Sequence, residues 1–331
     1  MLQISTFLQR EALRLAQLIS DNADELALLE RSITARACDA KHLRKSARTH
    51  LRDALPITLG RELHAWAVSL ERCRVWIDAA RRELCVLPLG GGAVGTEFGI
   101  PTNYARLALE ELNRGREGAD RFHAPVDRVE AVQSQGPVAL ASGMHRLLAL
   151  ELGRIASDLR LLSSGPRAGL HEIDLPAVQP GSSAMPAKVN PSVAEMVNQV
   201  CFQVMGCDTT VAMACEAGQL ELNVMMPVIA WNALHATTIL REALRALRIR
   251  CVEGLEVDAE RARVLLDRST ATATALSPFI GYEATAAVAQ EAVRSGRLIR
   301  DLVVERGLLD RDRLDQILSV EAMTRPGIRG H

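Results

Sequence analysis

Apolar residues recur every three or four positions along several long stretches of the chain, which is the spacing of one face of an α-helix. The stretch 226–251 follows this pattern, with Pro227 near the start of the helix or at a kink. The clearest stretch is 137–162, whose apolar stripe comprises Leu140, Met144, Leu148, Leu152, Ile155, Leu159 and Leu162. Both stretches exceed the average globular helix of about 11–12 residues. The pattern therefore predicts a bundle of long helices.

A further long helix is predicted to begin at Pro191. Asn190 is a good N-cap, and proline suits the first helical position because its missing N–H costs nothing there. The apolar face of this helix is expected to comprise Val193, Val197, Val200 and Val204. Because bundles of long helices often bury faces between subunits, we expect an oligomer.

The composition also favours helices. Only 3% of the residues are aromatic and β-branched runs are short, whereas Leu, Ala, Arg and Glu dominate, so we expect an all-α protein. After Gly254 the predicted helices become shorter and more charged, with breaks at Ser277-Pro278 and Gly281. These shorter helices are expected over 257–267, 285–296 and 310–318. The change predicts a central long-helix bundle domain, residues 1–253, and a small C-terminal helical domain, residues 254–331.

Length and charge restrict the class of protein. With 331 residues, 48% of them hydrophobic, the chain is long enough to bury a sizeable core. Its 39 lysines and arginines nearly balance 40 acidic residues, and no basic block predicts a nucleic-acid surface. Polar residues interrupt the first twenty positions, and nowhere do about 18 apolar residues run together. We therefore expect a cytoplasmic protein without nucleic-acid or membrane partners.

The seven cysteines are odd in number and form no C-x-x-C pair. Most of them lie in apolar helical stretches, so they are predicted to be reduced core residues. Cys201, Cys207 and Cys215 lie close together in the sequence, but their spacings match no zinc pattern. We expect no metal site.

The most informative segment is 181–191, with the sequence GSSAMPAKVNP. Here a flexible Gly-Ser-Ser stretch leads through Lys188 to a predicted helix start. Backbone N–H groups at a helix start and a lysine both favour a bound carboxylate, and they would stabilise a serine alkoxide acting as a base. Glycine, serine and proline before a helix are also ordinary loop chemistry, with the lysine merely solvated. The residues alone support the two readings equally.

The whole segment matches the signature G-S-S-x-M-P-x-K-x-N-P without a mismatch, so the chain resembles the fumarase/aspartase superfamily. The resemblance implies that Ser182 is the general base that removes the substrate Cβ proton, with Ser183 in support. It implies that Lys188 and Asn190 bind the substrate carboxylates. Glu195 occupies the position of a carboxylate that in relatives hydrogen-bonds a histidine from another subunit.

A second segment, 48–60, has the sequence RTHLRDALPITLG and resembles the superfamily's R-T-H/Q-x-Q-D-A-x-P-x-T-L-G segment. It departs by placing Arg52 where glutamine is usual. The resemblance implies that Thr49 and His50 contact a substrate carboxylate, and histidine is the side chain best suited to change charge near neutral pH, so His50 joins the catalytic set. Taken alone, a histidine between Arg48 and Arg52 is more simply a polar loop residue.

A glycine-rich stretch, 90–96, lacks the lysine and the preceding strand of a phosphate-binding loop. It resembles the superfamily's G-G-T-A-x-G-T-G turn, with Glu97 replacing the last glycine. A positive φ at Glu97 would strain this turn.

Three further stretches resemble aspartate ammonia-lyases more than other members: 161–170 followed by Glu172-Ile173, 197–202, and 219–224. The implied reaction is the reversible conversion of L-aspartate to fumarate and ammonia by serine-base proton abstraction and anti elimination. Since the signature loop is shared across the superfamily, fumarate hydratase or another dicarboxylate lyase is the alternative.

The resemblance also implies an amino-terminal segment with a Ser-Thr-Asn motif ahead of the point where this chain begins, near the start of its first long helix. Active sites of the superfamily combine segments of three subunits, so a homotetramer with shared sites is expected. No cofactor is implied, and activation by Mg²⁺ is left open. We therefore expect either a lyase completed by a separate amino-terminal piece or a truncated, non-catalytic helical assembly protein.

Overall fold

The computed structural model describes residues 2–181, 184–186, 188–319 and 322–323. The chain forms two compact units. Unit 1 comprises Met1–Arg31, Val68–Leu159 and Ala177–Cys251, and unit 2 comprises Ser32–Ala67, Arg160–Pro176 and Val252–His331. Each unit therefore combines segments that are far apart in the sequence. The predicted domain division at Gly254 stays a prediction.

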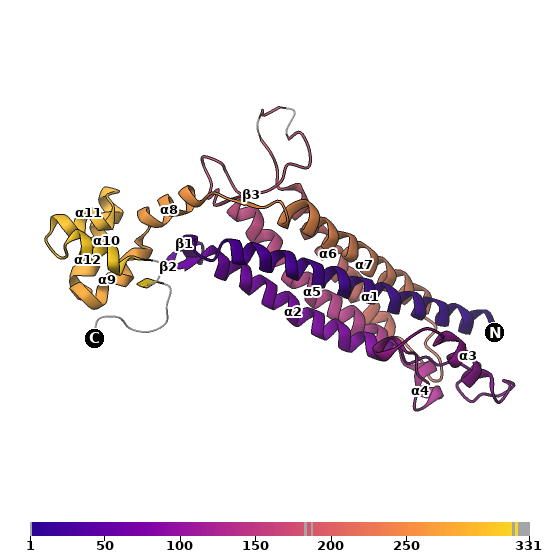
Figure 1. The fold of residues 1–331 in the computed structure, drawn as a ribbon. Helices are drawn as coiled ribbons and strands as arrows, with labels where there is room; N and C mark the ends of the chain where they lie inside the picture. The colour runs from indigo at the N-terminus through magenta and orange to yellow at the C-terminus, as the bar shows by residue number, and fades with distance from the viewer. Residues whose placement is uncertain (1, 182–183, 187, 320–321, 324–331) are drawn as a thin grey trace. The chain divides into compact units, whose positions relative to one another are not determined.

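Long helices that run side by side form unit 1 (Figure 1). They are α1 (Leu2–Asp39), α2 (Leu59–Leu84), α5 (Gly136–Leu162), α6 (Ser192–Glu216) and α7 (Met226–Leu247). Of these, α1, α2 and α5 also contribute residues to unit 2. The predicted fold class, a helical protein built on a long-helix bundle, is confirmed. None of the described helices is long and apolar enough to cross a membrane.

Two of the predicted long helices form as expected. The helix predicted over 137–162 is α5, and its apolar stripe is buried from Leu148 onwards, whereas Leu140 is 40% exposed. The helix predicted over 226–251 is α7, continued by a π-helical turn, η2 (Arg248–Val252). Pro227 lies in the first turn of α7, where it removes no helical hydrogen bond.

Helix α6 starts one residue later than predicted. Pro191 occupies the N-cap position with φ −76° and ψ 54°, so the prediction that Asn190 caps this helix is wrong. The proline ring restrains φ but leaves ψ free to be non-helical, which moves the first helical residue to Ser192. Val193 and Val200, predicted on the buried face, are only half-buried. The buried residues of α6 are Ala194, Val197, Asn198, Cys201, Val204, Cys207, Asp208, Val211 and Ala214.

All seven cysteines are free thiols. The core position predicted for them is confirmed for Cys73, Cys85, Cys201, Cys207 and Cys251. It is wrong for Cys38, which is exposed near the end of α1. Burial raises the pKa of the Cys201 thiol to about 12, so this thiol is uncharged and unreactive at neutral pH.

Shorter elements connect α2 to α5 in unit 1. They are α3 (Tyr104–Leu112), the 3₁₀ turn η1 (Gly118–Asp120) and α4 (Arg128–Gln133). The glycine-rich loop before α3 contains Glu97 with φ 61°, which confirms the predicted strain. The Arg128 side chain holds this turn, because it pairs with the Glu97 carboxylate and donates a 3.0 Å hydrogen bond to the Leu89 carbonyl.

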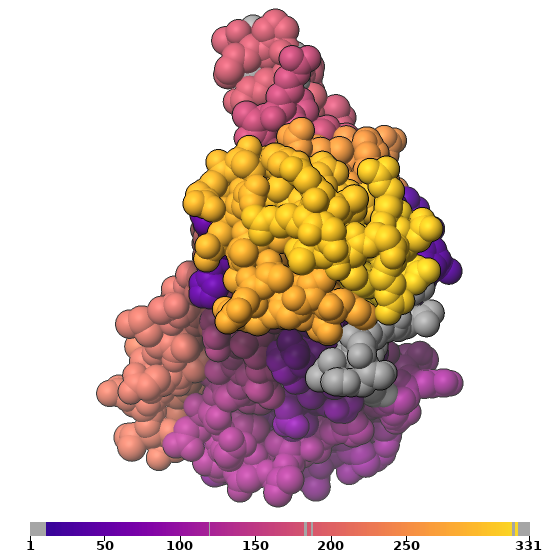
Figure 2. Space-filling view, turned by 90° about the vertical axis from the view of Figure 1, so that its left-hand side faces the viewer, coloured from indigo at the N-terminus to yellow at the C-terminus, as the bar shows by residue number. Residues whose placement is uncertain are grey.

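Unit 2 contains short strands and short helices. Its strands are β1 (Arg44–Thr49), β2 (Arg52–Thr58), β3 (Ile173–Asp174) and β4 (Glu256–Val257), paired antiparallel as β1-β2 and β3-β4. Its helical elements are α8 (Ala259–Arg268), η3 (Thr270–Thr272), α9 (Ala273–Ile280), α10 (Tyr282–Ser295), α11 (Ile299–Glu305) and α12 (Arg311–Ile317). Figure 2 shows the C-terminal helices, coloured orange to yellow, as one compact mass.

The predicted C-terminal helices 257–267, 285–296 and 310–318 correspond to α8, α10 and α12. The break predicted at Gly281 is confirmed, since this glycine separates α9 from α10 with φ 78°. The break predicted at Ser277-Pro278 is wrong, because Pro278 lies inside α9. The helix ends two residues later, so the proline costs a single helical hydrogen bond near the end.

Candidate active site

A hairpin in unit 2 carries Thr49 and His50 (Figure 1). Thr49 ends β1 and pairs with Arg52, so His50 and Leu51 form a two-residue turn. Their φ angles are 54° and 58°, and positive φ at both central residues is the conformation of a type I′ turn. Taken alone, the sequence favoured a polar loop at His50. The Asn-Gly or Asp-Gly signal typical of such hairpins is absent here. This short hairpin lies within a fold that is otherwise predominantly helical.

The His50-Leu51 turn is under backbone strain. The left-handed conformation costs a residue with a Cβ roughly 1–2 kcal/mol. Leu51 is 73% exposed and His50 is also exposed, so burial of their own side chains does not hold the turn. Contacts of the neighbouring strand residues must therefore maintain it.

A buried ion cluster holds β1. The Nζ atom of Lys45 lies 2.5 Å from Glu62 Oε2 and 2.9 Å from Glu172 Oε2. Arg48 approaches Glu172 with two prongs, Nη1 at 3.1 Å from Oε2 and Nη2 at 2.9 Å from Oε1. Lys45 is only 2% exposed and Glu172 is fully buried. No signal in the sequence shows that a lysine is buried here, so this cluster escaped prediction.

The second set of predicted residues belongs to unit 1, at the start of α6. Ser182 and Ser183 lie outside the described residues. The described ends of their loop close on each other: Gly181 has φ 90°, and a Cβ added there would lie 2.4 Å from the Lys188 carbonyl oxygen. Any side chain at position 181 would force these ends apart. Glycine is therefore required for the closed base of the loop.

Further hydrogen bonds define how this loop joins α6. The Gln179 amide donates to Ser192 Oγ at 2.6 Å, and the Lys188 N–H donates to the Met185 carbonyl at 3.2 Å. Ser192 N–H donates to the Asn190 carbonyl at 2.8 Å. The described residues from Ala184 to Val189 are exposed ahead of α6, which Figures 1 and 2 show with the rest of the fold. The bonds join the two ends of the loop to the first residue of the helix.

The start of α6 has the chemistry of an anion site. Pro191 at the N-cap has no polar side chain with which to accept from the first-turn N–H groups, and these groups carry the positive end of the helix dipole. The exposed Lys188 adds a full positive charge. Asn190 and Glu195, two and seven residues after Lys188, are half-buried. The arrangement suits a carboxylate ligand.

The described structure therefore contains two sets of candidate residues. Thr49 and His50 are adjacent in unit 2, whereas Lys188, Asn190 and Glu195 belong to unit 1, where they are near one another in the sequence. Within the described residues, no group of three or more His, Cys, Asp or Glu side chains is placed to hold a metal ion.

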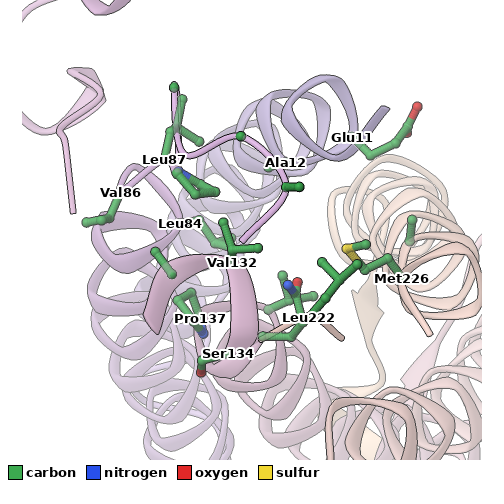
Figure 3. Close-up of a pocket in the computed structure, with 18 of the residues that line it drawn as sticks. Glu11, Ala12, Leu84, Val86, Leu87, Val132, Ser134, Pro137, Leu222 and Met226 are labelled. Carbon is green, nitrogen blue, oxygen red and sulfur yellow. The ribbon is translucent and has the colours of Figure 1, made fainter. Parts of the chain in front are cut away.

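Unit 1 also contains an apolar cavity of about 780 Å³ (Figure 3). Its lining includes Leu84, Leu87, Val132 and Met226, and its one charged lining residue is Glu11. An apolar cavity with a carboxylate and no cation is unsuited to a dicarboxylate. None of the predicted site residues that the structure describes lines it.

Comparison with known protein families decides the family. A family model described as "Lyase" matches residues 11–206, which include both predicted active-site segments, and one described as "Fumarase C C-terminus" matches residues 273–325. The chain belongs to the fumarase/aspartase superfamily of lyases. The resemblance recognised in segments 48–60 and 181–191 is thereby confirmed.

Individual members of the superfamily are similar over most of this chain. The aspartate ammonia-lyase of Bacillus subtilis is 41% identical over 290 residues, which cover 86% of this chain and 60% of that protein. The class II fumarate hydratase of Parasynechococcus marenigrum is 40% identical over 312 residues, covering 94% of this chain and 66% of that protein. The chain thus spans 60% and 66% of the length of these curated relatives.

Solved structures of the superfamily share the fold. The crystal structure of fumarate lyase:delta crystallin from Brucella melitensis bound to cobalt matches with a TM-score of 0.90 and 40% sequence identity. The match covers 97% of this chain and 69% of that one. The helical bundle is therefore the shared architecture of the superfamily.

Proposed function

We propose that the protein is a carbon–nitrogen lyase that reversibly converts L-aspartate to fumarate and ammonia. The observation that carries the proposal is segment 181–191, an uninterrupted superfamily signature that leads into a helix start suited to anions. The closed base of the loop supports it, because Gly181 and Lys188, the described residues on either side of the serine pair in the sequence, lie close together. Similarity to aspartate ammonia-lyases supports the choice of substrate.

In the proposed reaction Ser182 Oγ removes a proton from the substrate Cβ. The electron pair left on Cβ forms the carbon–carbon double bond, and the C–N bond breaks so that nitrogen leaves with its bonding pair as ammonia. The carbanion formed beside a carboxylate places negative charge on both carboxylate oxygens, which requires preorganised donors. Lys188, Asn190 and the N-terminus of α6 would supply those donors. Thr49 and His50 would bind a substrate carboxylate.

The proposed assembly is a homotetramer with shared active sites. Thr49 and His50 belong to unit 2, and Lys188 and Asn190 belong to unit 1. In the superfamily each active site combines segments of three subunits, which is the basis of this proposal. Glu195 would support a histidine from another subunit. The proposed steps use only side chains and backbone groups of the protein, and activation by Mg²⁺ is a separate variable to test.

Fumarate hydratase is the second candidate, because the Parasynechococcus relative is 40% identical, close to the 41% of the Bacillus aspartate ammonia-lyase. Water loss from malate and ammonia loss from aspartate share the proton abstraction and differ at the leaving group. The two functions therefore share the signature loop, and the substrate must be decided by assay. A non-catalytic helical assembly protein is the third candidate, and the same assay tests it.

The decisive experiment follows the ultraviolet absorbance of fumarate with purified full chain. L-Aspartate and L-malate are supplied separately, each with and without Mg²⁺, alone and with the amino-terminal domain of an aspartate ammonia-lyase. Fumarate from aspartate supports the proposal, whereas fumarate from malate alone selects the hydratase. Absence of turnover in every mixture would leave the assembly protein as the function.

A further inference from the structure

Lys45, Arg48, Glu62 and Glu172 form an ion cluster in unit 2 in which one carboxylate, that of Glu172, contacts both cations. Its two cations and two carboxylates balance in charge, and they join β1, the first turn of α2 and the residues that follow α5. Glu172 is the shared member, because its carboxylate contacts both cations. Loss of this one carboxylate would leave the buried Lys45 and the half-buried Arg48 facing a single acid.

The backbone of Glu172 is fixed by hydrogen bonds at both its N–H and its carbonyl group. Its N–H donates to the Leu162 carbonyl at 2.9 Å, and its carbonyl accepts from the Asp258 N–H at 3.1 Å. The neighbouring residue Ile173 pairs with Val257 in the β3-β4 ladder. The carboxylate therefore projects from a fixed piece of backbone and can position what binds to it.

The two cations that reach Glu172 lie three residues apart on β1. In a regular strand such residues point to opposite faces. The β1-β2 pairing is irregular between Ser46 and Arg48, where Ser46 faces Pro56 and Arg48 faces Asp53. Such an irregularity increases local twist and redirects side chains. It lies between Lys45 and Arg48, which converge on one carboxylate, and it comes directly before Thr49.

Arg48 connects the cluster to the proposed substrate-binding residues. The next residue is Thr49 and the one after it is His50, whose positive φ requires outside support. A two-pronged guanidinium–carboxylate contact fixes orientation as well as distance, which a single lysine contact does not. The contact with Glu172 therefore sets the direction in which β1 enters the turn.

We propose that Glu172 is a positioning residue that, through Arg48 and Lys45, holds Thr49 and His50 in their substrate-binding geometry. The role of this positioning in catalysis rests on the proposed function. The contacts by which Glu172 fixes the hairpin all lie within unit 2. Glu172 touches no substrate in this proposal and acts only through the strand.

The test compares Glu172→Gln, Glu172→Asp and the control Glu30→Gln in the full chain. Glu30 also forms an ion pair, with Arg74 Nε at 3.0 Å, but this pair joins α1 to α2 in unit 1. Amide hydrogen exchange over residues 44–58 reports on the hairpin without any need for activity. Loss of one buried charge contact implies at least about tenfold faster exchange there in Glu172→Gln. Glu172→Asp, which keeps the charge, should recover part of the protection.

Kinetics supply the second readout. If the chain turns over aspartate, Glu172→Gln should raise KM at least about tenfold with a smaller change in kcat, because it misplaces a carboxylate-binding group. The control Glu30→Gln should change neither KM nor hairpin exchange. Should Glu172→Gln not fold, Arg48→Lys removes the two-pronged contact while keeping the charge, and the same two readouts apply.

The outcomes separate the two proposals. Unchanged exchange over residues 44–58 in a folded Glu172 or Arg48 variant, or an equal effect of Glu30→Gln, overturns the positioning role. A wild-type chain that forms no fumarate from aspartate in any of the mixtures refutes the proposed function. The exchange measurement still decides whether Glu172 holds the hairpin.

Discussion

The side-chain amide nitrogen of Asn22 lies 3.4 Å from Nε2 of His145 in the interior of unit 1. Thr237 Oγ1 lies 3.4 Å from the other ring nitrogen of His145, so one buried polar cluster joins α1, α5 and α7. Burial lowers the pKa of His145 to about 4, because desolvation of the charged ring outweighs the opposing attraction of Asp208. The ring is therefore neutral at neutral pH.

This histidine should make the stability of the fold depend on pH. An unfolded histidine titrates near pH 6.5, so between about 6.5 and 4 the unfolded chain binds more protons than the folded one. The stability that the neutral His145 ring contributes is therefore fully present above the histidine pKa of the unfolded chain. It is lost as the pH falls toward the pKa of His145 in the folded chain. As the pH falls through this window, we expect the free energy of unfolding to decrease by up to about 3 kcal/mol more in the wild type than in His145→Gln. Urea unfolding at stepped pH measures this difference.

His64→Gln is the matched control, because His64 is exposed on α2 and its replacement should keep the wild-type pH slope. An equal loss of stability on acidification in wild type and His145→Gln would show that the buried ring does not titrate as inferred.

The long helices could be predicted because their cause is local. In α5 the residues Leu148, Leu152 and Ile155 recur at helical spacing, and all three are fully buried. A period of three or four residues needs no knowledge of the partner helix. The predicted start of α6 was wrong by one position, because the ψ angle of Pro191 depends on the loop before it.

The hairpin could not be predicted, because its cause is not local. Glu172, which holds Arg48, comes 124 residues later in the sequence. Neither His50 nor Leu51 carries a turn signal, and the few β-branched residues nearby favour no strand. For the candidate site, the signature identified Lys188 and other residues by type, but the contacts that fix the hairpin appear only in the folded chain.

Relief of the strained turn should stabilise the protein. Leu51→Gly removes the Cβ that makes φ 58° unfavourable, and the exposed leucine side chain loses little packing. We expect a gain of about 1 kcal/mol in the free energy of unfolding, since the relief exceeds the extra backbone entropy of glycine. Leu55→Gly is the control, because Leu55 is exposed on β2 without a positive φ and should lose roughly 0.5–1 kcal/mol. A loss in both variants would argue against strain at the turn.

The closed base of the 181–188 loop should be sensitive to a single methyl group. Gly181→Ala places a Cβ 2.4 Å from the Lys188 carbonyl oxygen and imposes a side chain on φ 90°. Because the described loop residues from Ala184 to Val189 are exposed, thermal stability should change little, whereas kcat/KM for aspartate should fall at least about tenfold. Gly206→Ala is the control, because Gly206 lies in α6 with open space where a Cβ would be added. It should raise the free energy of unfolding by roughly 1 kcal/mol and keep its activity. Full activity of Gly181→Ala would separate the loop from catalysis.

The proposed base predicts different effects for the two neighbouring serines. Ser182→Ala removes the group that takes the Cβ proton, so kcat should fall by about 10²–10⁴ with little change in KM. Ser183→Ala keeps the Ser182 hydroxyl, so its kcat should fall less than about tenfold. Lys188→Met removes a carboxylate-binding cation, and its main effect should be a higher KM, because the ground state and the transition state both use this contact. If Ser183→Ala proved the more damaging of the two serine changes, the base would be the second serine, and the proton would be taken one residue closer to Lys188 in the sequence.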